Sequence, residues 1–260
     1  VASFLVEAIH KYIFGDFLNI SFLGEVGSAA GSLGGPAAAI LVPLSMGVNP
    51  VYAVAGGISL LGMGILPGFV AGYLIGLIGP VLEKKLPLGL DIIGGVLVLA
   101  PFTRLLAVQV APVVDVTLAN IGDMILVAAN QSPILMGFLL GGLMKIICTS
   151  PLSSMAVTAM LGLQGLAMGI AAIACFGGSF TNGIVFKRLK LGGSGNIIGV
   201  MLEPLTQADI VTANPIPIFG SNFIGGGLAG IAAAYFGIIN NAPGTASPIP
   251  GLLAPFAFNE

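Results

Sequence analysis

The residues best suited to chemistry lie together in one polar stretch, residues 201–230, of an otherwise apolar chain. Within it, Glu203 directly precedes Pro204 and Asn214 directly precedes Pro215. Proline disfavours α geometry at the residue before it, so we expect both side chains on extended or re-entrant backbone. Inside a bilayer, such backbone survives only where protein or a wet cavity surrounds it, and an ionisable residue there is a candidate binding group. The stretch therefore predicts that Glu203 accepts hydrogen bonds from ligand hydroxyls or carries a proton. The alternative is a solvated carboxylate in a loop between two spans.

Uncharged polar residues follow Glu203 closely in the sequence. Gln207, Asn214, Ser221 and Asn222 supply amide and hydroxyl groups. A few such groups fix the orientation of a ligand in a pocket that otherwise excludes water. This composition favours a neutral polyol as the ligand.

A second candidate group stands earlier in the chain, at Lys145 and Thr149, just before the polar break at residues 149–154. These side chains could line the same cavity as Glu203. The alternative is a lysine that snorkels from a helix end to the membrane interface.

Catalytic and metal-binding arrangements find little support. His10 is the one histidine, and Cys148 and Cys175 form no CxxC pair, so no Cys-His arrangement, Ser-His-Asp triad or metal cluster can be assembled. We expect no catalytic residue, no metal and no cofactor. A basic patch for nucleic acid is also missing, since Lys and Arg number only 8 in 260 residues.

Composition places the chain in a membrane. Hydrophobic residues make up 57% and charged residues 7%, and the mean hydropathy is +1.09. Soluble domains carry about 25% charged residues. Residues 26–82, 146–186 and 210–259 contain no Asp, Glu, Lys or Arg. A spanning helix needs about 20 apolar residues, so each run can hold two. The apolar blocks are continuous, which favours helices over a strand-built barrel.

The expected fold is an all-α integral membrane protein, a polytopic helical bundle with re-entrant hairpins and broken helices, in one domain over residues 1–260. Residues 24–35 read as a loop or re-entrant tip, residues 83–85 and 187–190 as cytoplasmic charged loops, and the tail 240–260 as irregular. Gly68, Gly72 and Gly76 form a small-xxx-small pattern for close helix packing. The start at Val1 favours an N-terminal truncation. The expected apolar segments are 36–47, 50–67, 91–110, 115–130, 134–147, 155–178 and 223–239.

A family resemblance rests on the Glu-Pro motif, on the Asn-Pro that follows it and on several longer sequence segments: GGPAAAILVPLSMG, LVLAPFTRLLA, KIICTSPLSSMAVTAMLG and ANPIPIFG. Over most of its length the chain resembles the membrane-embedded IIC component of phosphotransferase-system sugar permeases, of the glucose and chitobiose type. It is most similar to a toxin-regulator-like branch of that superfamily. The resemblance implies a homodimer in the bacterial cytoplasmic (inner) membrane, alternating access, and a separate IIB protein that phosphorylates the sugar. It also implies that Glu203 binds sugar hydroxyls.

From the residues and the resemblance together, the expected substrate-binding set is Glu203, Gln207, Asn214, Lys145 and Thr149. The chain would be at most the membrane subunit of a sugar phosphotransferase, with no catalytic centre of its own. Transporting relatives carry a histidine upstream of Glu-Pro, whereas the comparable text here, LMKIICTSP, has none. Two alternatives stay open: a sensor or regulator of the same fold that transports nothing, and an ion- or proton-coupled transporter that uses Asp123, Glu203 and Asp209.

Overall fold

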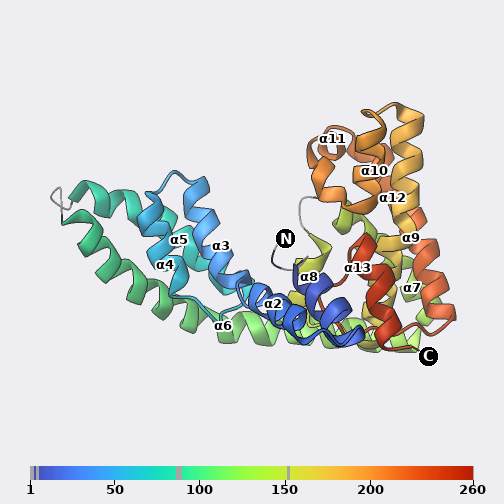
Figure 1. The fold of residues 1–260 in the computed structure, drawn as a ribbon, viewed down its shortest axis with the longest axis horizontal. Coiled ribbons are helices and arrows are strands. Elements are labelled where there is room, and N and C mark those ends of the chain that lie inside the picture. Colours follow the sequence, from blue (N-terminus) through green and yellow to red (C-terminus); the bar gives the residue numbers. More distant parts are fainter. Residues whose placement is uncertain (1–2, 4–5, 86–89, 151–152, 260) are drawn as a thin grey trace. The chain divides into compact units, whose positions relative to one another are not determined.

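A computed structural model describes residues 3, 6–85, 90–150 and 153–259, and these residues form helices with no strand among them (Figure 1). Four of the helices are long and apolar enough to cross a membrane: 65–85, 92–131, 165–189 and 215–235. The chain is an all-α, multi-pass membrane protein, as its composition predicts. It divides into two compact units, one of residues 29–118 and one of residues 1–28 together with 119–260.

The unit of residues 29–118 packs through small residues. Its elements are α3 (Gly34–Ser45), α4 (Pro50–Ile58), α5 (Ile65–Lys85) and the first part of α6 (Asp91–Gln131). A Cβ placed on Gly68 of α5 would lie 2.3 Å from the carbonyl oxygen of Gly35, and one on Gly72 would lie 2.9 Å from the Cα of Ala39. Gly76 meets the side chain of Met46 in the same way. The small-xxx-small interpretation of α5 is therefore confirmed, because these glycines let α5 and α3 approach closely.

The other unit is built on three helices, α7 (Pro133–Thr149), α9 (Gly165–Leu189) and α12 (Pro215–Tyr235), which pack against one another (Figure 1). Glycines again set the spacing. A Cβ on Gly137 of α7 would lie 2.6 Å from the Gly230 carbonyl oxygen, and one on Gly230 would lie 2.1 Å from the Gly137 carbonyl oxygen. One turn along, Gly141 faces Gly226 of α12. α7 and α12 therefore touch backbone to backbone.

Shorter elements complete this unit. The boundary between the two units in the sequence, between residues 28 and 29, falls within α2. The shorter elements are η1 (Glu7–Phe17), α2 (Ser21–Gly31), α8 (Ser154–Met160), α10 (Ser194–Leu202), η2 (Pro204–Gln207), α11 (Ala208–Ala213), α13 (Pro248–Leu253) and η3 (Ala254–Ala257).

Two predicted apolar segments are joined, and one predicted span is broken. Residues 91–110 and 115–130 belong to one continuous helix, α6, because Pro112 removes one backbone donor without ending it. The predicted span 155–178 is broken: α8 ends at Met160 and α9 starts only at Gly165. Gly162 and Gly165 both have φ +58, a left-handed conformation that glycine adopts freely, and this turn separates the two helices.

Three predictions of loops also need correction. Residues 24–31 are helical in α2 rather than a loop, and the chain bends by 44° at residues 32–33 before α3, a geometry that fits a broken span or the predicted re-entrant tip. The basic residues 84–85 and 187–188 sit in the last turns of α5 and α9, where positive charge offsets the negative end of the helix dipole. The tail is irregular over residues 240–247, as predicted, but then forms α13 and η3.

The breaks predicted before the two prolines are confirmed. α10 ends at Leu202, and Glu203 has extended backbone with φ −148 and ψ 94. Asn214, with φ −132 and ψ 52, separates α11 from α12. Proline fits the first position of a helix, so Pro204 and Pro215 each begin the next element. The third expected break is confirmed in part: Ser150 is extended, α8 begins at residue 154, and Pro151 lies outside the described residues.

Candidate functional site

Glu203 lies half-buried at the non-helical junction between α10 and η2. Its Oε2 accepts a hydrogen bond of 3.0 Å from the hydroxyl of Ser247. Ser247 is only 2% exposed and stands just before Pro248, the first residue of α13. A carboxylate on extended backbone thus meets a neutral hydroxyl, which is the kind of contact that a ligand hydroxyl would make.

Several neighbours act on the Glu203 carboxyl, which lies outside the spanning helices. Burial raises its pKa above the ordinary value, because desolvation disfavours the charged form. The Ser247 hydroxyl, the Leu205 backbone N–H and the positive charge of Lys145 act in the opposite direction without cancelling the rise. Glu203 therefore takes up a proton at a higher pH than an ordinary glutamate does.

Ser247 is held in place by the segment that carries it. The Ser154 hydroxyl at the start of α8 donates to the carbonyl oxygen of Ala246, and the Gly244 N–H donates to the Thr158 hydroxyl at 3.2 Å. The sequence prediction missed Ser247, although the text Ser-Pro-Ile-Pro signals the same pre-proline break as Glu-Pro. The irregular tail is thus part of the surroundings of Glu203.

Replacing Ser247 with Ala should raise the pKa of Glu203 further, because the substitution removes a donor that stabilises the carboxylate. Infrared titration of the protonated carboxyl band, assigned by its loss in Glu203→Gln, would measure the shift. Ser247→Thr keeps a hydroxyl and should restore the pKa. Ser45→Ala, which removes an exposed hydroxyl bonded within α3, is the matched control. An unchanged titration in Ser247→Ala would contradict the contact.

Lys145 is fully buried among the three central helices. Its stem runs past two glycines: a Cβ on Gly178 of α9 would lie 2.6 Å from Lys145 Cγ, and one on Gly226 of α12 would lie 2.3 Å from Lys145 Cβ. The ammonium donates to the Cys175 carbonyl oxygen at 3.1 Å. Lys145 therefore points into the protein, and the alternative of a lysine snorkelling to the interface does not hold.

Thr149 connects the same three helices one turn further along α7. Its hydroxyl donates to the Lys145 carbonyl oxygen at 2.9 Å and accepts from Asn222 Nδ2 of α12 at 3.0 Å. Asn182 Nδ2 of α9 approaches both the Thr149 hydroxyl and the Val200 carbonyl oxygen at 3.5 Å. The sequence prediction missed Asn182, whose signal is an amide within a long charge-free run.

The structure brings three of the five predicted site residues into one region. Lys145 and Thr149 lie on one face of α7, which contacts η2 directly after Glu203. The Lys145 charge is also close enough to act on the Glu203 carboxyl.

Gln207 and Asn214 are engaged elsewhere. Gln207 Oε1 accepts from Asn196 Nδ2 at 2.6 Å, and Gln207 Nε2 donates to the Thr206 hydroxyl at 3.1 Å. Asn214 Nδ2 donates to the Ile210 carbonyl oxygen at 3.0 Å, which satisfies the end of α11. Their side chains would have to exchange these partners before they could reach a ligand.

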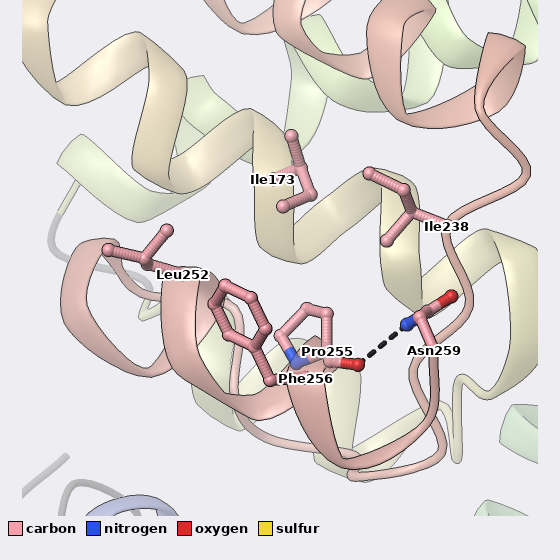
Figure 2. A pocket seen from close by; sticks show the side chains of 6 residues that line it. All are labelled: Ile173, Ile238, Leu252, Pro255, Phe256 and Asn259. Carbon is pink, nitrogen blue, oxygen red and sulfur yellow. Dashed lines mark hydrogen bonds between the residues drawn. The ribbon is translucent and has the colours of Figure 1, made fainter.

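An apolar hollow of about 150 Å³ is lined by none of these residues, and Figure 2 shows its lining. Its one polar side chain, Asn259, already donates to the carbonyl oxygens of Pro255 and Ile239. Such a lining suits an alkyl group rather than a polyol. The lining residues are Ile173, Ile238, Leu252, Pro255, Phe256 and Asn259.

Comparison with known proteins identifies the family of this chain. No curated protein and no solved structure matches the chain. Among protein families, the one described as "Phosphotransferase system, EIIC" matches residues 1–260. That family pairs a multi-pass helical membrane fold with sugar uptake, in agreement with the spans found above. The chain therefore belongs to the phosphotransferase-system EIIC family.

Proposed function

We propose that this protein is the sugar-binding permease component of a phosphoenolpyruvate-dependent sugar phosphotransferase system, and that Glu203 binds the ligand hydroxyls. The observation that carries the proposal is the Ser247 hydroxyl on Glu203 Oε2 at a non-helical break. A carboxylate that accepts from a neutral hydroxyl in a half-buried place is suited to a sugar.

The other predicted residues have supporting roles in this proposal. Lys145 and Thr149 line the far wall of the site, next to Asn222 and Asn182. Gln207 and Asn214 assist after they release their present partners. The ligand thus meets a carboxylate, amides and a hydroxyl, while the surrounding glycine-rich helices exclude water.

Transport in this proposal follows alternating access, and the sugar is phosphorylated by a separate IIB protein rather than by this chain. The protein works as a homodimer in the bacterial cytoplasmic membrane, and residues 1–260 form one functional domain. Movement of a substrate-holding part against the rest of the protein is the usual logic of such transporters.

A second candidate function is a sensor or regulator of the same fold that transports nothing. The observation in its favour is the text LMKIICTSP, which carries Lys145 and no histidine. In the structure residues 143–149 of this segment end α7, and the residue buried there is Lys145.

Uptake by reconstituted vesicles separates these functions. With the permease, radiolabelled sugar should accumulate as sugar phosphate only when a IIB protein and its phosphoryl donors are supplied. Binding without uptake under either condition would favour the sensor. Uptake that follows a pH gradient without IIB would favour the ion- or proton-coupled transporter, for which Asp123 and Asp209, both exposed here, are the further acids.

A further inference from the structure

Two buried amide oxygens among α7, α9 and α12, here called the three-helix centre, have no hydrogen-bond partner within the described residues. They are Asn182 Oδ1 on α9 and Asn222 Oδ1 on α12. Both side chains are 0% exposed, and the Nδ2 atoms of both point to the Thr149 hydroxyl of α7. Each amide is therefore oriented by its donor end, while its acceptor end is left unused.

An acceptor without a partner in an apolar interior is costly, since it has lost its hydrogen bond to water. Proteins place a donor at such points, either an ordered water or a ligand. Here the two amides donate through Nδ2 to the same threonine hydroxyl, so both unused oxygens belong to one polar cluster, which a hydroxyl-bearing molecule can complete. A hydrogen-bond donor beside Asn182 and Asn222 would satisfy both oxygens.

The charge of the surroundings narrows the kind of donor. Lys145 is one turn away on α7, fully buried and positive, and the one salt bridge among the described residues joins Lys11 to Glu7 rather than involving Lys145. A metal cation would be repelled by this ammonium. A fully deprotonated anion carries no hydrogen that it could donate to the two amide oxygens. A neutral hydroxyl remains, from water or from a polyol.

The centre is also connected to the Glu203 site. Asn182 Nδ2 approaches the carbonyl oxygen of Val200, which lies on α10 shortly before that helix ends at Glu203. α7, which carries Thr149, contacts η2 on the other side of Glu203. A ligand hydroxyl bound to Glu203 and another at the amides would therefore belong to one molecule or to adjoining subsites.

We propose that Asn182 and Asn222 form a second acceptor subsite, which takes a hydroxyl of the same neutral polyol that Glu203 binds. The inference rests on the proposed function and adds two residues from α9 and α12 to it. Thr149 accepts from the Nδ2 atoms of both amides, which leaves both Oδ1 atoms unused and able to accept from the ligand.

The test measures sugar affinity and thermal midpoint in detergent for Asn182→Leu and Asn222→Leu, with glucose, N-acetylglucosamine and mannitol as the probes. Leucine matches asparagine in size and removes the unpaired oxygen together with the Nδ2 donor to Thr149. Each variant should keep its midpoint within a few degrees without sugar, and should lose about tenfold in affinity for the sugar that the wild type binds. Asn130→Leu is the control, because Asn130 is exposed and donates only within α6.

The outcomes separate the sources of the hydroxyl. A changed midpoint with unchanged affinity would mean that a buried water fills the subsite, and would overturn the proposal. No binding of any probe by the wild type would overturn the proposed function and this inference together. Unchanged affinity in both leucine variants, beside a weakened Glu203→Gln, would overturn the inference alone.

A second measurement does not depend on the leucine variants folding. Monodeoxy analogues of the bound sugar, titrated against wild type and Glu203→Gln, should identify two hydroxyls. Removing the first hydroxyl should weaken binding to the wild type but not to Glu203→Gln. Removing the second should weaken binding to both proteins. If binding to the wild type depends on a single sugar hydroxyl, and Glu203→Gln no longer shows that dependence, then no hydroxyl is left for the amides. This result would contradict the second subsite.

Discussion

Glu203→Gln should weaken sugar binding by about 10- to 100-fold and leave the fold intact. The amide keeps the size of the side chain but loses the charge that strengthens each hydrogen bond from a ligand hydroxyl, and a hydrogen bond to a charged group contributes about 1.5–3 kcal/mol. Isothermal titration of the purified protein in detergent would measure it. The pH dependence of binding gives a second readout. Because burial raises the pKa of Glu203, the wild type should lose affinity as pH falls, starting at a higher pH than an ordinary glutamate would. Glu203→Gln should not show this loss.

The matched control is Asp209→Asn, which removes an exposed acid in the first turn of α11, six residues along the same polar stretch. Its affinity should stay within about twofold of the wild type, since an exposed charge contributes little. Equal affinities of wild type and Glu203→Gln would remove the central assignment. A loss in Asp209→Asn instead would move the site to the exposed end of α11.

Gly230→Ala should destabilise the protein strongly although it adds a single methyl group. That methyl would lie 2.1 Å from the Gly137 carbonyl oxygen and 3.0 Å from the Gly141 Cα, and both neighbours are backbone atoms that no rotamer change can move. Overpacking costs about 1–3 kcal/mol, and a backbone clash falls at the upper end. For a chain of this size, we expect the thermal midpoint to drop by about 6–12 °C.

Gly220→Ala is the control on the same helix, because no atom outside the local backbone of α12 lies within 4 Å of the methyl it would add. Alanine favours helix over glycine, so this variant should unfold at the same or a slightly higher temperature. The two variants are compared by fluorescence-detected thermal unfolding with a thiol-reactive dye, since the chain has no tryptophan. Similar midpoints for both would show that α7 and α12 do not meet through their backbones.

Local rules predicted the parts of the site that depend on neighbours in sequence. The breaks at Glu203 and Asn214 follow from the proline after each, and proline acts on the residue before it whatever the rest of the fold does. The close packing of Gly68 and Gly72 follows similarly from the small-xxx-small spacing. Composition alone was enough for the membrane class.

Features that depend on distant contacts were not predictable. Ser247 reaches Glu203 across the fold, and the position of Asn182 beside Thr149 depends on how α9 packs on α7. The hydropathy of residues 155–178 is continuous, so it does not show the turn that Gly162 and Gly165 make. A span, a short buried helix and the turn between them can all be apolar, so hydropathy does not distinguish them. The left-handed backbone of the two glycines is what separates α8 from α9.

The glycine contact between α7 and α12 has a mechanical consequence. Sliding one helix by a turn along the other would bring Gly137 opposite Ala234 in one direction, or Gly141 opposite Asn222 in the other, so a side chain would enter the backbone contact in either case. The two helices can therefore turn as one lever but cannot shear past each other. A rearrangement that keeps this helix pair intact would then bend the chain at its non-helical joints, which include Glu203, Asn214 and the segment before α13.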